Sequence, residues 1–349
     1  MKPFTPAYPK SDAIKGLRWL SKAKKYDACR GDTFSCTWAD DDQLYTCADD
    51  TYGVNWAYKS NLACLRVEGM PPNHQIFNVN PMEAYFPFAT REGQDTWKAC
   101  STLFVDGALY MSMSQHSWAG QYPDCIQRTY DSHIIKSTDY GKTWSPKRAI
   151  GNAMWPGPRF ANPFFVQFGK AYAGAMDDYI YAVSNSATWN NGNYMILGRV
   201  LREKLGQLNT ADWEYFGGTE ADNDAKWITD LGKAVGIFKH RGRASMIGMQ
   251  WVPALERFIM PQWAYMDLDR DDPWHETLLA IYEAPKPWGP WRHVHTEMNW
   301  GQAEYGPCLP AKWFEENGKR CWLVSSGDFT RQKENSPYSF TVQQLEWLV

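Results

Sequence analysis

Acidic residues stand at both ends of the first hairpin that the sequence predicts, TWADDDQLYTCA at 37–48. Asp32 precedes its first strand, and Asp49 and Asp50 follow its second strand. Because the two strands of a hairpin run antiparallel, its entry and its exit lie at the same end. We therefore expect Asp32 and Asp50 to face each other, where such a pair can act as proton donor and as nucleophile or base. The three aspartates at 40–42 are explained as the turn at the opposite end.

Later hairpins add polar and aromatic residues to the same end of the molecule. The candidate substrate-binding residues are Asp49, Trp38, His116, Arg128, Tyr130, Asn162, Asp177, Trp263, Glu304 and Tyr305. Further strand entries and exits contribute Asp95, Lys98, Gln115, Arg159, Asp178, Arg241 or Arg243, Tyr265 and Asp328. Carboxylates, cations, a histidine and aromatic rings together suit a polar sugar site. Any single acidic residue at a strand end is more often a turn or cap residue.

These residues must be positioned by a repeated element, and five hairpins recur along the chain. They occupy 37–48, 99–114, 162–176, 245–263 and 307–326, with glycine-containing turns such as Asp106-Gly107 and Asn317-Gly318. Successive turn centres lie about 62 to 86 residues apart, which suits four-stranded blades with their loops. The sequence therefore predicts an all-β fold, a five-bladed β-propeller formed as a single domain by residues 1–349.

Four other segments refine this prediction. Residues 12–26 are predicted as a short helix within an N-terminal extension of about residues 1–28, and 338–349 as a last strand that could close the ring. Strand-like segments within 195–240 could form an extra blade. Residues 137–144 match the Asp-box pattern S-x-D-x-G-x-T-W, a structural turn to which we assign no catalytic role.

The amino-acid composition limits the classes of binding partner that we expect. The chain has 36 basic and 39 acidic residues, and this near balance argues against nucleic acid or an anionic membrane as the main partner. Aromatic residues make up 15% of the chain, with 19 tryptophans. Most should pack between sheets, and the remainder can stack on sugar rings. We expect a monomer that binds a polysaccharide or an oligosaccharide, with no membrane-spanning segment.

The sequence gives little indication of a metal site or of a redox-active cysteine motif. None of the eight cysteines forms a CxxC pair, which disfavours a zinc site, and we predict no metal ligands and no cofactor. A structural calcium ion on the propeller axis is compatible with this fold, although no EF-hand-like loop occurs. Free thiols and disulfides both fit the cysteine count, so the count does not indicate the cellular compartment. Secretion is expected if a signal peptide has been removed from the mature chain.

A family resemblance extends over nearly the whole chain. It rests on Gly31-Asp32-Thr33 and Asp49-Asp50, on 165–169, and on 282–291 with Trp322-Leu323. These segments resemble an uncharacterised-domain propeller family that is related to sialidase-like glycosidases and includes endo-D-arabinanases. The resemblance implies a catalytic pair at Asp32 and Asp50. The family commonly has Gly-Asp-Gly around the second aspartate, whereas this chain has Asp49-Asp50-Thr51, a departure that affects the loop shape and the substrate.

The expected function is a glycoside hydrolase that cleaves a polysaccharide, similar to endo-D-arabinanases. One carboxyl group would protonate the leaving oxygen, and the other would attack the anomeric carbon or activate water. A polysaccharide lyase acting by β-elimination on a uronate-containing glycan is the alternative, because His116, Arg128 and Tyr130 offer an acid, a base and a cation. A non-catalytic carbohydrate-binding propeller is the third hypothesis.

Overall fold

The computed structural model describes residues 4–84, 95–119, 126–147, 151–185, 189, 192–219, 225–266, 276–328 and 336–349. Within these ranges the chain forms antiparallel β-strands joined by loops and short 3-10 turns. The all-β prediction is confirmed. No helix in the ranges given is both long enough and apolar enough to span a membrane.

Three of the four sheets contain one predicted hairpin each. The second hairpin belongs to a three-stranded sheet, β7 (Thr96–Val105), β8 (Ala108–Ala119) and β9 (Ile126–Ser137). The third belongs to a six-stranded sheet, β10 (Phe164–Phe165), β11 (Tyr179–Asn185), β12 (Gly192–Leu201), β13 (Trp213–Phe216) and β14 (Trp227–Ile228), with β15 (Gly236–Ala244) on β12. The fourth belongs to a four-stranded sheet, β16 (Gln250–Val252), β17 (Arg257–Tyr265), β18 (Thr277–Ala284) and β19 (Arg292–Glu297).

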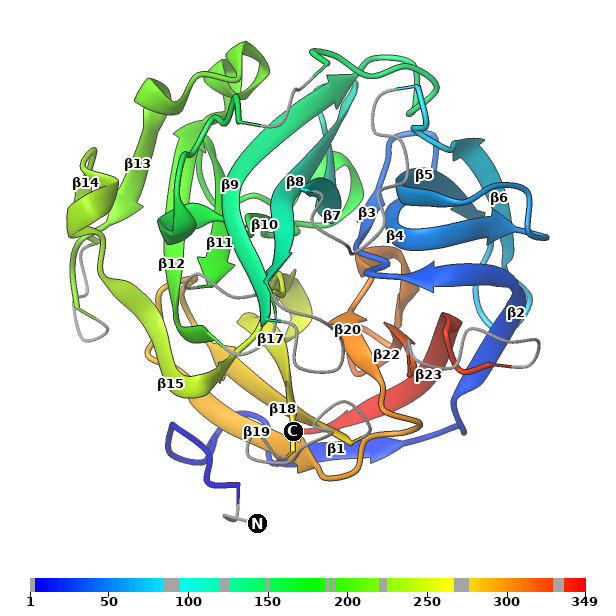
Figure 1. The fold of residues 1–349 in the computed structure, drawn as a ribbon. Coiled ribbons are helices and arrows are strands. Elements are labelled where there is room, and N and C mark those ends of the chain that lie inside the picture. The colour runs from blue at the N-terminus through cyan, green and yellow to red at the C-terminus, as the bar shows by residue number, and fades with distance from the viewer. Residues whose placement is uncertain are drawn as a thin grey trace.

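The remaining sheet is the largest, with ten strands, and it combines the first and fifth hairpins. Its main path is β20 (Tyr305–Cys308), β22 (Arg320–Ser326), β23 (Ser339–Leu348), β2 (Lys24–Asp32), β4 (Leu44–Val54), β5 (Ser60–Glu68) and β6 (Gln75–Asn80). Three short strands pair beside this path, β1 (Gly16–Trp19), β3 (Cys36–Trp38) and β21 (Phe314–Glu315). The four sheets stand around a common centre, nearest to which lie β3, β7, β10 and β20 (Figure 1).

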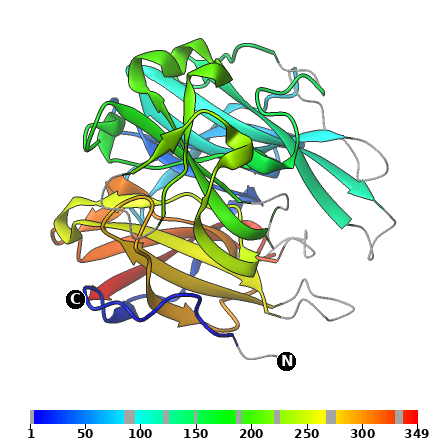
Figure 2. The ribbon, with the colours of Figure 1, turned by 90° about the vertical axis from the view of Figure 1, so that its left-hand side faces the viewer.

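Strand β2 joins two hairpin units. Its first residues, Lys24 to Tyr26, pair with β23, its last residues pair with β4, and Arg30 pairs with both. The chain before it runs along the fourth hairpin's sheet, where Lys10 bridges His293 of β19; both views show the blue segment beside the yellow and orange strands (Figures 1 and 2). The N-terminal segment is therefore part of the packed structure.

The predicted helix at 12–26 is wrong. Residues Gly16–Trp19 form β1, which pairs with β23, and β2 begins at Lys24. Hydrogen bonds to the C-terminal strand outweigh the local helix propensity of this segment, as tertiary context commonly does. The predicted C-terminal strand at 338–349 is present as β23.

The third hairpin differs from its predicted form. Its second strand is β11, whereas 170–176 forms a compact turn in which Ala171 and Tyr172 have positive φ and Gly174 N–H donates to Phe168 O at 2.8 Å. The candidate blade at 195–240 supplies β12 and β15, which pair with each other in this same sheet. In the part of the chain that the structure describes, these strands extend the third unit.

Aromatic rings fill the spaces between units, as composition suggests. Trp155, which follows β9, meets Trp213 of β13 edge-on at 5.1 Å between ring centroids. Phe238 of β15 and Tyr282 of β18 make a similar contact at 4.9 Å. Such buried edge-to-face pairs add to the stabilisation from apolar burial.

The turn at 137–144 is closed by its own side chains. The Asp139 carboxylate accepts hydrogen bonds from the Thr143 N–H at 2.9 Å and from its hydroxyl at 2.7 Å. Trp144 is buried, and its Nε1 donates to Gly141 O at 2.9 Å. These contacts give the segment a structural role.

Gly31 lets β2 and β4 approach closely. Its φ is 142°, and an added Cβ would lie 2.8 Å from Thr51 Cβ and 3.1 Å from Asp49 O. We expect Gly31→Ala to lower the free energy of unfolding by about 2 kcal/mol or more, through backbone strain and overlap. Gly107→Ala is the matched control, because Gly107 has φ 71° with no atom within 4 Å of the new Cβ, so only strain of about 1 kcal/mol applies. Urea denaturation of both variants tests this, and equal losses would contradict it.

Candidate active site

An irregular pairing of β2 with β4 brings three aspartates together. Asp32 lies opposite Asp49, but the register shifts between Arg30 and Asp32, so that 50–52 of β4 face Gly31 alone. Asp50 sits in this irregularity with φ 40°. Neighbouring side chains of a regular strand point to opposite faces. Here the distortion allows consecutive aspartates to reach the same cation.

That cation is Lys98 of β7, from the second hairpin unit. Its Nζ lies 3.5 Å from Asp49 Oδ1 and also forms an ion pair with Asp50 Oδ2. The side chains of Lys98 and Asp49 are each only 3% exposed, whereas that of Asp50 is 25% exposed. Asp50 is therefore the member of this group that a ligand can reach most readily.

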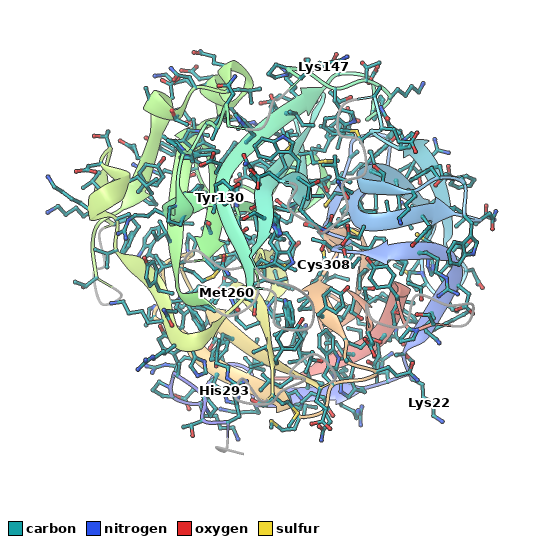
Figure 3. The ribbon with its side chains drawn as sticks, viewed as in Figure 1. Lys22, Tyr130, Lys147, Met260, His293 and Cys308 are labelled. Carbon is teal, nitrogen blue, oxygen red and sulfur yellow. The ribbon has the colours of Figure 1, made fainter. Side chains whose placement is uncertain are left out.

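Asp32 is held by residues from both ends of the chain. Tyr305 of β20 donates its hydroxyl hydrogen to Asp32 Oδ2 at 2.6 Å, and Thr33 donates to Oδ1 at 3.2 Å. The ring of Tyr305 packs on Trp263 of β17 at 5.3 Å. Tyr338 completes the group by donating to Asp50 O at 3.1 Å. Cys308, three residues after Tyr305, lies near the centre of the ring of sheets, whereas Lys22 lies at its rim (Figure 3).

Burial and charge set the protonation of this cluster, which we define as Asp32, Asp49, Asp50 and Lys98. Burial, with the charge of Asp50 beside it, raises the pKa of Asp32 to about 6 despite the opposing effects of Lys98 and Tyr305. Burial also raises the pKa of Asp49 well above its ordinary value. The pKa of Lys98 is raised: burial lowers it, but the attraction of the three aspartates outweighs that effect. A charged lysine thus stands beside two buried carboxyl groups, Asp32 and Asp49, whose pKa values are raised.

Two other predicted residues, His116 and Asn162, are fully buried. The His116 ring meets Trp189 edge-on at 4.4 Å, and burial followed by the charge of Lys98 lowers its pKa well below the ordinary value. Asn162 donates to Thr129 Oγ1 at 3.0 Å and to Asn185 Oδ1 at 2.7 Å. Because Thr129 pairs with His116, these residues link the second and third units at the cluster end.

Tyr130 of β9 forms a separate polar group with strand-end residues. Gln115 Nε2 donates to the Tyr130 hydroxyl at 2.9 Å and to Asp95 Oδ2 at 3.2 Å. Burial and a hydrogen bond with Asp95 raise the pKa of Tyr130. The side chain of Arg128 lies outside the described residues.

Glu304 precedes Tyr305 but makes different contacts. Ser325 of β22 donates to its Oε2 at 2.6 Å, and burial raises its pKa to about 7. Trp263, only 1% exposed, stands behind Tyr305 and supports that ring. Of Glu304, Tyr305 and Trp263, Tyr305 is the one whose hydroxyl donates a hydrogen bond to a residue of the cluster, Asp32.

Trp38 and Asp177 are placed at the turn end of the hairpins, away from Asp32. Trp38 ends β3 just before the first turn, and its Nε1 donates to Asp42 Oδ1 at 3.0 Å. Asp177 precedes β11 and accepts hydrogen bonds from Tyr179 N at 3.0 Å and from the Tyr181 hydroxyl at 2.6 Å. Neither residue lies at the Asp32 end of its hairpin, because Trp38 leads into a turn and because β11 starts later than expected.

Sequence reasoning missed Tyr338 and Thr33, and it listed Lys98 only as a strand-entry residue. Tyr338 could have been found by its place just before the closing strand. Among the described cysteines, namely Cys29, Cys36, Cys47, Cys64, Cys100, Cys308 and Cys321, none forms a disulfide. Across the same described ranges, no three His, Cys, Asp or Glu side chains gather so as to hold a metal ion.

Comparison with known families places this chain. Residues 16–328 match DUF4185, whose description is a domain of unknown function. The chain belongs to the DUF4185 family. No curated protein matches this DUF4185 chain.

Solved structures share the fold of this DUF4185 protein at low sequence identity. A candidate hydrolase from Bacteroides ovatus is 13% identical with a TM-score of 0.53, over 90% of this chain and 85% of that one. An α-L-arabinanase variant from Cellvibrio cellulosa is 8% identical with a TM-score of 0.50, over 91% of each chain. The Bacteroides ovatus protein Xyloglucan PUL GH43B is 12% identical with a TM-score of 0.51, over 92% of this chain and 53% of its own. These similarities concern the fold.

The raised pKa of Asp32 makes a prediction about stability. The folded protein holds this proton up to about pH 6, against the ordinary 3.8, so ionisation costs about 3 kcal/mol of stability as pH rises between these values. Asp32→Asn removes the ionisable group and keeps an acceptor for Tyr305. Relative to the natural protein, we expect this variant to gain up to about 3 kcal/mol on going from pH 4 to pH 7.5. Urea denaturation at both pH values measures this, and an equal difference at the two would refute it.

Proposed function

We propose that this protein is a glycoside hydrolase that cleaves a polysaccharide, similar to endo-D-arabinanases, with Asp32 and Asp50 as its catalytic residues. The observation that carries the proposal is the pairing of a buried, proton-retaining carboxyl with a partly exposed carboxylate held by Lys98. A buried carboxyl group with a raised pKa beside a more exposed carboxyl group is an arrangement typical of a catalytic acid and its partner. The resemblance of Asp32 and Asp50 to the family pair supports the same residues.

The two aspartates take different roles in this proposal. Asp32, with a pKa of about 6, is the acid that gives its proton to the glycosidic oxygen as the C–O bond breaks. Asp50, 25% exposed, attacks the anomeric carbon or removes a proton from the attacking water. Lys98 positions Asp50 through its ion pair, and Tyr305 positions Asp32.

The proposed architecture is one five-bladed propeller that forms a single domain. Five hairpin units support this count, and strands of four of them, β3, β7, β10 and β20, lie nearest to the centre (Figure 1). The first and fifth units share the ten-stranded sheet because β2 pairs with both β4 and β23. We take that shared strand as the closure of the ring.

The other two hypotheses fit the site less well. A lyase would use His116 as a base, yet this ring is fully buried against Trp189. A lectin has no need of two buried carboxyl groups and a third, partly exposed one around a buried lysine, an arrangement that costs stability. Hydrolysis uses both the retained proton and the partly exposed carboxylate.

Substitution of either aspartate tests the proposal. Asp32→Asn and Asp50→Asn should each lower kcat/KM by about 10³-fold or more, because each removes an acid–base or nucleophilic group while conserving shape. Asp40→Asn is the control: Asp40 lies exposed on the turn end, where it accepts a hydrogen bond from the Tyr140 hydroxyl at 2.9 Å. Turnover is measured as reducing ends released from D-arabinan, L-arabinan, xylan and xyloglucan.

Near-normal turnover in both aspartate variants would disprove the catalytic pair. Accumulation of a 4,5-unsaturated uronate chromophore from an acidic polysaccharide would instead establish a lyase. Binding of a polysaccharide without release of reducing ends would support the carbohydrate-binding hypothesis.

Tyr305→Phe offers a second test through pH. The hydroxyl of Tyr305 lowers the pKa of Asp32, so its removal should raise that pKa. If Asp32 is the acid, the alkaline limb of kcat/KM should move upward by about one pH unit, the effect of one hydrogen bond to a charged group. Tyr215→Phe is the control, since the buried Tyr215 hydroxyl accepts from Trp155 Nε1 at 2.6 Å in the third unit. A downward shift, or the same shift in the control, would contradict this role.

A further inference from the structure

The turn after β4 exposes a tryptophan in a strained conformation. Trp56 is 48% exposed, and its φ is 56°, directly after Asn55 with φ 58°. Asparagine adopts left-handed φ values readily, but a bulky residue does so at a cost of about 1 to 2 kcal/mol. Neither its exposure nor its backbone favours tryptophan at this position. Such strain, when it is retained, is characteristic of functional sites.

Neighbouring side chains hold the Trp56 ring in place. The ring of Tyr52 lies 4.8 Å away, tilted by 53°. The guanidinium of Arg30 lies 5.5 Å from the centre of the Trp56 ring, and Lys59 Nζ lies 5.8 Å from that of Tyr52. Arg30 is buried, and its Nη1 donates to Ser336 O at 3.0 Å. The exposed ring is therefore oriented by partners on two strands.

These partners connect Trp56 to the catalytic aspartates. Arg30 stands two residues before Asp32 on β2, and Tyr52 stands two residues after Asp50 on β4. Burial and then the negative charge of Asp50 raise the pKa of Tyr52, which agrees with this proximity. Asp49 lies opposite Asp32 and Val54 lies opposite Cys29, so only three residue steps of β2, about 10 Å at roughly 3.3 Å per residue, match the stretch from Asp49 to the end of β4. An aromatic surface thus leads from the aspartates to the turn that carries Trp56.

We propose that Trp56 and Tyr52 form an accessory subsite, the rim platform, on which a sugar ring of an extended glycan stacks while another unit is cleaved. Exposed aromatic faces bind the apolar C–H face of a sugar without needing a charged partner. The rim platform rests on the proposed function for its role in cleavage. It makes the enzyme prefer a polymer to short oligosaccharides.

Another aromatic hollow provides the competing location. A cavity of about 270 Å³ at the turn end is lined by Trp38, Trp251 and Phe314 among others. Its Trp38 ring is already engaged, since Lys170 Nζ lies 5.7 Å from the ring centre and Asp42 accepts from Nε1 at 3.0 Å. The rim platform is the stronger site because it adjoins the aspartates.

Trp56→Asn removes the ring and suits the left-handed backbone, so folding should be retained. Tyr140→Asn is the matched control, because Tyr140 is 37% exposed with φ 57° but lies on the turn end, where its hydroxyl donates to Asp40. Each change is made in the natural protein and in Asp50→Asn. Binding to D-arabinan, L-arabinan, xylan and xyloglucan is measured by affinity electrophoresis, and kinetics are measured on the cleaved polymer and on its trisaccharide.

We expect Trp56→Asn to raise KM for the polymer about 10-fold with little change in kcat. The rise in KM for the trisaccharide should be at least several-fold smaller. In the Asp50→Asn background, Trp56→Asn should weaken binding of the polymer. Tyr140→Asn should change none of these. Unaltered polymer binding and KM in Trp56→Asn would overturn the rim platform while leaving the catalytic proposal intact. A loss of kcat that is equal for both substrates would also overturn it, as would loss of binding in Trp251→Ala alone.

Polymer binding that depends on Trp56 without any cleavage would defeat the catalytic proposal but keep the rim platform as a binding site. Failure of the natural protein to bind any of the four polymers would overturn both.

Discussion

The pairing of one strand, β2, with two others is the constraint on which the site depends. Lys24 to Tyr26 bond to β23, and Asp32 faces Asp49 on β4, so two hairpin units distant in sequence share one sheet. The two partners lie on opposite edges of β2, and at Arg30 the strand pairs with Ser339 of β23 and with Gly53 of β4 at once. Opposite the next residue, Gly31, β4 carries extra residues, and Asp50 takes a positive φ. This irregularity, in a strand that is paired on both edges, is what gathers the carboxyl groups.

Once gathered, the carboxyl groups determine the electrostatics of the end of the molecule where they lie. One lysine, 3% exposed, faces three aspartates, so full ionisation would leave excess negative charge in a desolvated setting. Retaining a proton on Asp32 relieves this repulsion and supplies an acid at the same time. The free-energy cost of burial and the proposed reactivity therefore have one origin, as is usual when activity needs a destabilised site. Tyr305 holds the Asp32 carboxyl group through its hydroxyl, and Trp263 supports the Tyr305 ring.

Much of the fold could be predicted because hairpins are local. Turn residues such as Asp106-Gly107, with φ 51° and 71°, specify a reversal without any distant partner. The same local geometry brought Asp32 and Asp50 to one end. One failure was non-local, because 16–19 and 24–26 became strands through bonds to β23. The other was a local turn that the sequence pattern did not reveal, at 170–176. Lys98 and Tyr338 reach the aspartates from 48 and 288 residues away along the chain, and no pattern in a single sequence encodes such contacts.

The partnership of β2 with β23 also has a consequence for biosynthesis. The hydrogen-bonding partners of residues 24–26, at 340–342, do not exist until more than 300 further residues have been translated. Until then the strand that carries Asp32 has an unpaired edge, which exposes it to wrong partners during a long synthesis. A nascent or prematurely terminated chain that lacks 338–348 has neither the second partner of β2 nor the hydrogen bond from Tyr338 to Asp50 O. The surroundings of the aspartates are in this way completed only after Tyr338 and β23 have been translated.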